Sequence, residues 1–187
     1  MVHREKRTIY VIFAIALALI APIIVIFTPL VIAITFYDNV HKIAFVPLPG
    51  SLTVYASAFA VVVASLVAMY FLKKRAFKIG LGVFAIIAFL FLFISGTKHY
   101  IYIETDMIES SHWLKGKKQY EWNEIVQVDY TKKTTDRERE DTIMLIFNDE
   151  STITLLQAGL VDYPTVQEIV NRAQKHGALV NEIIVNE

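Results

Sequence analysis

Three long stretches of this chain contain no charged residue, and they constrain its fold more than any other feature. They run from about Thr8 to Tyr37, from Ser51 to Leu72 and from Ile79 to Thr97. A helix needs roughly 20 apolar residues to cross the hydrocarbon core of a bilayer, and all three stretches reach or approach that length. The sequence therefore predicts three transmembrane helices, over about 8–37, 51–72 and 79–97.

The character of the sequence changes near Gly96, which divides a membrane domain (1–97) from a soluble domain (98–187). The first part carries eight Lys and Arg against two Asp and Glu, for a net charge of +6. The second part carries ten Lys and Arg against sixteen Asp and Glu, for a net charge of −6. This holds despite local clusters of lysine at Lys115, Lys117 and Lys118 and at Lys132 and Lys133. Because an acidic domain is repelled by phosphate backbones, we expect no nucleic-acid partner.

The positive residues predict which side of the membrane each part faces. With three crossings, the N-terminal segment and the loop between the second and third spans lie on one side. Together they hold seven cations: Arg4, Lys6, Arg7, Lys73, Lys74, Arg75 and Lys78. The other side holds Lys42 and Lys98. Because positive residues accumulate on the cytoplasmic side, we predict a cytoplasmic N-terminus and an extracellular C-terminal domain.

The first apolar run leaves an alternative topology open. It contains Pro22 and Pro29 within 30 residues. Proline removes a backbone donor and can break a helix, so a re-entrant hairpin would place the C-terminal domain inside the cell. A long, kinked or tilted helix is the simpler account. Apolar residues continue far beyond the signal-like Ala16-Leu17-Ala18, which favours an uncleaved anchor.

Small residues line one face of the second span. Alanine recurs every four residues, at Ala56, Ala60, Ala64 and Ala68, and this spacing lets another helix approach closely. We expect this face to pack within the chain's own three-helix bundle, with a homo-oligomer seam as the alternative. We expect the short apolar loop over 38–51 to dip into the headgroup layer, with an exposed partner contact as the alternative.

The last ninety residues predict a β domain. Alternating apolar residues indicate six strands, over 98–104, 107–114, 117–122, 125–133, 142–148 and 151–157. A helix follows over about 163–176, with Asp162 and Pro164 at its start and Gly177 at its end. The tail over 178–187 fits a further strand or a loose end. The predicted fold class is an α+β membrane protein: three transmembrane helices, then a small antiparallel β domain capped by a C-terminal helix.

This succession of strands closed by one helix resembles the bacterial pleckstrin-homology-like domain. The resemblance is carried by YIYIETDMIESS (100–111), YEWNEIVQV (120–128), TIMLIFNDESTITLL (142–156) and the helix from Tyr163 to His176. It implies a partly open barrel that binds lipids, peptides or proteins through loops and sheet edges. Eukaryotic relatives place cations in the first turn for phosphoinositides, but here that turn is Glu104-Thr105-Asp106, so we do not expect headgroup recognition of that type.

Catalytic motifs are missing from the sequence. It has no Gly-rich phosphate loop, no His-Glu-x-x-His, no Gly-x-Ser-x-Gly and no cysteine. His99 and His112 lack the spacing of metal ligands. Glu121 and Glu124, on either side of Trp122, are expected to be solvated rather than to form an acid–base pair. We therefore expect a protein that is not an enzyme and that holds no metal or other cofactor.

Three aromatic residues are the candidate partner contacts. If Ile101 and Ile103 face the core, alternation turns Tyr100 and Tyr102 outward, and Trp113 falls on the same outer face. Exposed aromatic side chains anchor protein partners. Tyrosine and tryptophan also favour the membrane interface, and a twist at the strand end would return Trp113 to the core. Both of these alternatives remain open at the level of sequence.

Two functions fit these features. The first is a binding or scaffolding module tethered to a bacterial cell membrane, which intercepts an agent or touches a protein or peptide partner in envelope stress or in immunity to antimicrobial peptides. The second is an accessory subunit of a transporter or membrane enzyme, in which the helices are the working interface. The first is the expectation that the soluble domain favours.

Overall fold

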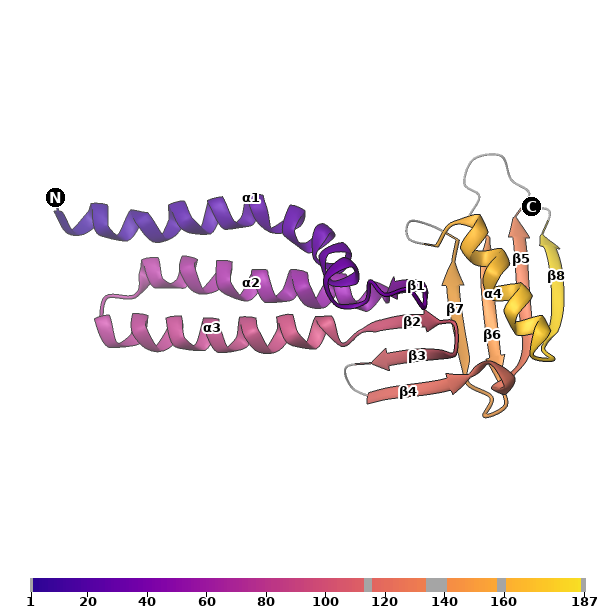
Figure 1. The fold of residues 1–187 in the computed structure, drawn as a ribbon. Coiled ribbons are helices and arrows are strands. Elements are labelled where there is room, and N and C mark those ends of the chain that lie inside the picture. Colours follow the sequence, from indigo (N-terminus) through magenta and orange to yellow (C-terminus); the bar gives the residue numbers. More distant parts are fainter. Residues whose placement is uncertain (1, 113–115, 134–140, 158–160, 186–187) are drawn as a thin grey trace. The chain divides into compact units, whose positions relative to one another are not determined.

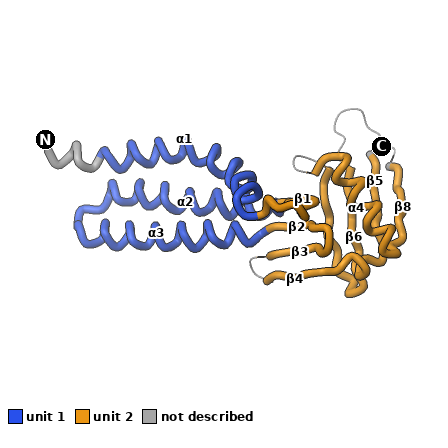
Figure 2. The backbone as a smooth tube through the Cα atoms, in the orientation of Figure 1, with its two compact units in different colours: residues 1–36, 47–99 blue, residues 37–46, 100–187 orange. Residues whose placement is uncertain are grey.

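The structure is a computed structural model that describes residues 2–112, 116–133, 141–157 and 161–185. They form two compact units (Figure 2): unit 1 comprises residues 1–36 and 47–99, and unit 2 comprises residues 37–46 and 100–187. The division differs from the boundary expected near residue 98, because the loop after the first apolar helix belongs to unit 2.

Unit 1 consists of three long helices (Figure 1): α1 (Val2–Phe36), α2 (Pro49–Phe71) and α3 (Arg75–Thr97). Length and composition make all three candidate membrane spans, over Thr8–Phe36, Pro49–Phe71 and Arg75–Thr97. The prediction of three apolar helices is therefore confirmed. The third helix begins at Arg75 rather than near Ile79, so two of the four loop cations lie in its first turn.

The helices of unit 1 pack through aromatic side chains and glycine. Tyr55 and Phe59 of α2 are buried, and their rings lie 5.2 Å from Phe93 and 5.3 Å from Phe89 of α3. A Cβ atom added at Gly96 would lie 2.5 Å from the Tyr55 ring. Because that distance is below van der Waals contact, only glycine allows α3 to approach this ring.

Helix α1 is continuous through Pro22 and Pro29 and bends in its second half (Figure 1). The structure therefore has one long helix where a re-entrant hairpin was the alternative. Its 29-residue apolar part is about 43 Å long at 1.5 Å per residue. This length exceeds the thickness of a hydrocarbon core, about 30 Å. A helix of this length fits into the bilayer by tilting or kinking.

Unit 2 contains two four-stranded sheets. The first has the order β1 (Lys42–Pro47), β2 (Tyr100–Glu104), β3 (Met107–His112) and β4 (Gly116–Glu121). The second has the order β7 (Thr152–Leu156), β6 (Thr142–Phe147), β5 (Ile125–Lys133) and β8 (Leu179–Val185). A single 3₁₀ turn, η1 (Trp122–Glu124), joins β4 to β5. The six predicted strands correspond to β2–β7.

Two segments of unit 2 differ from a simple antiparallel meander. The tail forms β8, which pairs in parallel with β5 from Gln127↔Leu179 to Lys133↔Val185. Part of the loop over 38–51 forms β1 at the edge of the first sheet, a strand that was not predicted from the sequence. A parallel pair needs a crossover connection, and α4 (Tyr163–Lys175), which lies between β7 and β8 in the chain, supplies it.

The core of unit 2 follows the predicted alternation. Ile103, Ile108, Val128, Ile143, Leu145 and Leu155 are completely buried. Helix α4 adds an apolar stripe, in which Val166, Ile169 and Ala173 are also completely buried. Its start is fixed by Asp162, whose carboxylate accepts a hydrogen bond from the Thr165 N–H at 3.0 Å.

Candidate functional site

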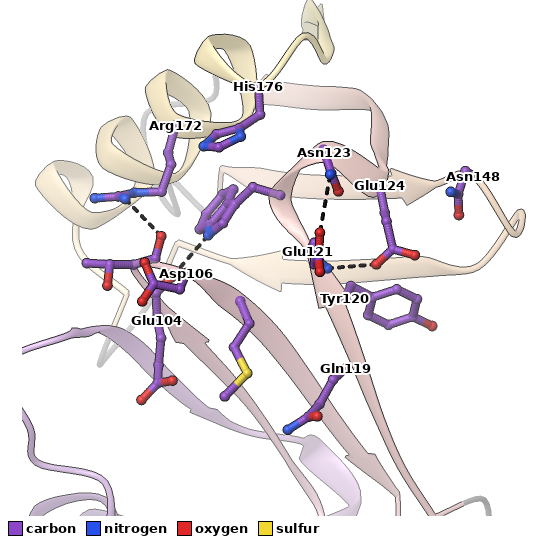
Figure 3. A pocket seen from close by; sticks show the side chains of 13 residues that line it. Glu104, Asp106, Gln119, Tyr120, Glu121, Asn123, Glu124, Asn148, Arg172 and His176 are labelled. Atoms are coloured by element: carbon purple, nitrogen blue, oxygen red, sulfur yellow. Dashed lines mark hydrogen bonds between the residues drawn. The ribbon is translucent and has the colours of Figure 1, made fainter.

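A cleft of about 1110 Å³ opens on the surface of unit 2 (Figure 3). Three parts of the fold form its walls: the β2–β3 turn, the end of β4 with η1, and the last turn of α4. The lining residues are Glu104, Thr105, Asp106, Met107, Gln119, Tyr120, Glu121, Trp122, Asn123, Glu124, Asn148, Arg172 and His176. Segments almost 70 residues apart in sequence (105 and 172) meet here.

Trp122 anchors the floor of the cleft. Its side chain is 2% exposed, and its indole N–H donates a hydrogen bond to the Glu104 carbonyl at 3.2 Å. This bond fastens η1 to the end of β2. The buried indole N–H thus has its hydrogen-bond partner within the fold.

Arg172 joins α4 to the same turn. Its guanidinium donates to the Thr105 carbonyl at 2.9 Å and to Glu168 at 3.3 Å. The guanidinium carbon lies 5.8 Å from the centre of the Trp122 ring, within the range of a cation–π interaction. In Figure 3, Arg172 and His176 project from α4 on one side of the cleft, while Glu121 and Glu124 lie on another.

Carboxylates dominate the charge of this cleft. Glu104, Asp106, Glu121 and Glu124 line it, against the guanidinium of Arg172 and the imidazole of His176. Asp106 is exposed, and Glu104 accepts a hydrogen bond from the Asn39 side chain at 2.9 Å. The arrangement gives a negative potential above an aromatic floor.

Glu121 and Glu124 have a structural role that the sequence reading did not find. They form a reciprocal capping box around η1, in which the Glu124 carboxylate accepts the Glu121 N–H at 2.7 Å. The Glu121 side chain accepts in turn from the backbone of Glu124. Both carboxylates are therefore held by the backbone, and this arrangement does not resemble an acid–base pair aimed at a substrate.

Tyr100 and Tyr102 are not exposed, and the expectation that they face solvent is wrong. They do lie on the sheet face opposite Ile101 and Ile103, but they are 8% and 5% exposed. Tyr37 covers them, with its ring 4.9 Å from each, and Phe45 of β1 stacks on Tyr100 at 5.4 Å. Trp113 lies outside the described residues.

A buried carboxylate lies on that same face of the first sheet. Glu109 is 3% exposed; it accepts hydrogen bonds from the Tyr100 hydroxyl at 2.6 Å and from Gln119 at 3.2 Å, and pairs with Lys117 at 2.6 Å. Burial alone raises the pKa of Glu109, but the hydrogen bonds from Lys117, Tyr100 and Gln119 outweigh it and hold the pKa below its usual range. The carboxyl is therefore ionised at neutral pH. Burial and the hydrogen bond to Glu109 in turn raise the pKa of Tyr100 well above its usual range.

Three of the lysines noted in the sequence are neutralised locally. Lys117 pairs with Glu109, and Lys118 lies 3.3 Å from Asp149. Lys132 of the second cluster pairs with Glu182. These pairs reduce the positive potential that the clusters would otherwise present.

The alanine face of α2 is exposed rather than packed against the other helices of unit 1. Ala56, Ala60, Ala64 and Ala68 are all exposed, whereas the intervening Ala58 is completely buried. The expected packing of this stripe within the chain's own bundle is therefore wrong. Tyr55, Ala58 and Phe59 make that contact instead, because these residues form the face of α2 turned toward its neighbours.

Metal binding has no support among the residues that the structure describes. Within them, no group of three or more His, Asp or Glu side chains is close enough to hold an ion. His99 belongs to unit 1 and His112 to unit 2.

The cleft itself is the feature that sequence reasoning missed. A partial signal was the run from Glu121 to Glu124 after a strand, since carboxylates around a tryptophan at a turn fit a capping motif. The contribution of α4 had no local signal. No protein-family model matches this chain, and no curated protein matches it.

Proposed function

We propose that this chain is a multi-pass membrane protein whose unit 2 is a non-enzymatic binding module, and that the acidic cleft takes a positively charged segment of a peptide or protein. The observation that carries this proposal is the cleft of about 1110 Å³ lined by four carboxylates. Lysine and arginine side chains match these carboxylates through charge-assisted hydrogen bonds.

The proposed setting is a bacterial cell membrane, with the N-terminus in the cytoplasm and unit 2 outside. The distribution of seven cations against two supports this orientation. The resemblance to bacterial pleckstrin-homology-like domains supports a binding role without catalysis. Antimicrobial peptides that lie on membranes are rich in Lys and Arg, so immunity to such peptides, or another envelope stress response, is the role we favour.

A titration of the full-length chain in detergent with a Lys-rich amphipathic peptide tests the cleft. We expect salt-sensitive binding that weakens roughly tenfold when Glu104→Gln and Asp106→Asn remove two carboxylates. Glu182→Gln is the matched control, because Glu182 is exposed on β8 and does not line the cleft. A peptide with Glu at the Lys positions should not bind.

Because the cleft variant removes two charges and Glu182→Gln removes one, a loss of binding free energy for the cleft variant that is only twice that for Glu182→Gln would show that binding follows net charge rather than the cleft. Tight binding of the acidic peptide would contradict the proposal directly. The melting temperature of each preparation used for binding shows whether a loss of binding comes from a folding defect.

The second candidate function is an accessory subunit that works through its helices. One observation favours it: the alanine stripe of α2 is exposed in unit 1. Small residues on an exposed face of a membrane helix allow close approach by a helix of another protein or of a second copy. Copurification of the full-length chain from native membranes distinguishes the two functions. The accessory-subunit function requires a partner whose copurification depends on the alanine stripe of α2.

A further inference from the structure

We propose that a groove between α2 and α3 binds one anionic phospholipid from the bilayer. This inference goes beyond the peptide-binding role of unit 2 and rests only on the proposed membrane insertion of the helices. The site lies wholly within unit 1, at the end where the loop over 72–74 joins the two helices (Figure 1).

The groove is apolar and has a volume of about 510 Å³. Its walls include Ala68 of α2, Leu72 of the loop, and Ala76, Phe77 and Gly80 of α3. Small side chains leave the space open, and a Cβ atom added at Gly80 would meet nothing within 4 Å. In a bilayer, hydrocarbon tails are the material that fills such a groove.

Cations surround the mouth of the groove. Lys73, Lys74 and Arg75 are exposed, and Arg75 directly precedes the groove residue Ala76. The Lys74 ammonium lies 6.0 Å from the ring centre of Phe77, which is part of the groove wall. Positive charge therefore lies close to the apolar groove.

Acidic residues that could neutralise these cations are missing from the surrounding sequence. No Asp or Glu occurs from residue 39 to residue 103, and Glu5 is the only one in unit 1. Lys74 is the N-cap residue of α3, so the positive end of the α3 helix dipole lies at this end of the groove and adds to the positive potential. The complementary ligand is an anion attached to a hydrocarbon chain.

An anionic phospholipid has this combination of groups. Its tail would occupy the groove while its phosphate lies beside Lys74 and Arg75. Basic pockets between helices near the cytoplasmic surface favour such headgroups. A zwitterionic lipid carries its own cation, which these residues would repel, so the geometry predicts selectivity for net negative charge.

Native mass spectrometry of the full-length chain in detergent tests the site, with dioleoyl phosphatidylglycerol and dioleoyl phosphatidylcholine as probes. We expect the wild type to retain one phosphatidylglycerol, with a preference of roughly tenfold over phosphatidylcholine. Ala76→Leu and Gly80→Leu, which fill the groove, should abolish retention. Ala18→Leu is the matched control, because Ala18 is an exposed alanine of α1 outside the groove.

A second pair of variants separates the site from general attraction by charge. Lys74→Gln should weaken phosphatidylglycerol binding by roughly fivefold. Lys78→Gln should change it little, because the Lys78 ammonium lies 4.6 Å from the Tyr10 ring of α1 instead. Lys74 is exposed, so its replacement leaves the fold intact.

Equal binding of the two lipids, retention by both groove-filling variants, or equal effects of the two lysine variants would overturn the lipid site. Alkaline carbonate extraction of native membranes provides the separate check. A chain released by carbonate would refute membrane insertion and the lipid site together. A chain that resists extraction but shows no lipid preference would refute the lipid site alone.

Discussion

At the scale of single residues, the most consequential finding is that polar groups in unit 2 are fixed by specific partners. Glu109 illustrates this, since three hydrogen-bonding partners compensate its burial. Removing one member of such a set leaves the others unsatisfied, and that penalty exceeds the net gain of the bond itself. Arg172 and Trp122 play the same role at the cleft, where they join the β2–β3 turn to α4 and η1.

Glu109→Gln is expected to lower the free energy of unfolding by about 2 kcal/mol near neutral pH, because a charged hydrogen-bond acceptor is lost. The folded pKa of Glu109 lies below its usual value. Its contribution is therefore complete above the usual pKa of about 4.3 and disappears as the pH falls through the folded pKa. The melting temperatures of wild type and variant should converge in acid.

Thermal unfolding of the full-length chain in detergent, followed across pH, measures this convergence. The control is Glu182→Gln, whose partner Lys132 is on the surface, and which should shift the melting temperature little at any pH. A Glu109→Gln deficit that stays constant into acid would contradict the assignment of an ionised, stabilised carboxylate.

At the scale of elements, the two faces of α2 have different neighbours. Ala58 is completely buried against the bundle, while Ala60, two residues later, is exposed. The helical period of 3.6 residues explains the contrast, because a step of two residues turns the side chain to the opposite side. The two alanines therefore form a matched pair for testing what the outer face does.

Ala58→Leu is expected to destabilise unit 1 by about 1–3 kcal/mol, because a filled interface cannot take three more carbon atoms without strain. Ala60→Leu should leave the melting temperature unchanged. If α2 carries an interface with another helix, Ala60→Leu should reduce copurification from native membranes while Ala18→Leu, on α1, does not. Equal thermal destabilisation by Ala58→Leu and Ala60→Leu would show that the alanine stripe packs inside the helix bundle.

At the scale of the whole chain, charge is segregated between a positive N-terminal half and a negative C-terminal half. Helix α1 is continuous, so the three helices alternate in direction along unit 1. The N-terminus of α1 and the α2–α3 loop then share one end, as the contact of Lys78 with Tyr10 shows. The positive-inside rule therefore applies to seven cations together.

Single cysteines test the resulting topology, because the native chain has none. Gln174→Cys on α4 should react with an impermeant thiol reagent on intact cells, since residue 174 is exposed and unit 2 is proposed to be outside. Lys74→Cys, also exposed, should react only after permeabilisation. The reverse pattern would place unit 2 in the cytoplasm.

The sequence by itself determined the elements of this protein. The three apolar helices, strands β2–β7 and helix α4 all follow from hydrophobic period, charge and capping residues such as Asp162. These signals are local, because each helix or strand contains the residues that predict it. Even the sheet face of Tyr100 and Tyr102 was predicted from alternation with Ile101 and Ile103.

Only the tertiary structure decided what covers those faces. Tyr37 and Phe45 shield Tyr100 and Tyr102 across more than 50 residues of chain, and β1 joins the sheet from a loop that had no strand signal. Likewise, the alanine stripe faces outward because Tyr55 and Phe59 make the contacts inside unit 1. The cleft exists because α4 returns to the β2–β3 turn through Arg172. Periodicity fixes which side chains share a face, but burial depends on which distant segment packs against it.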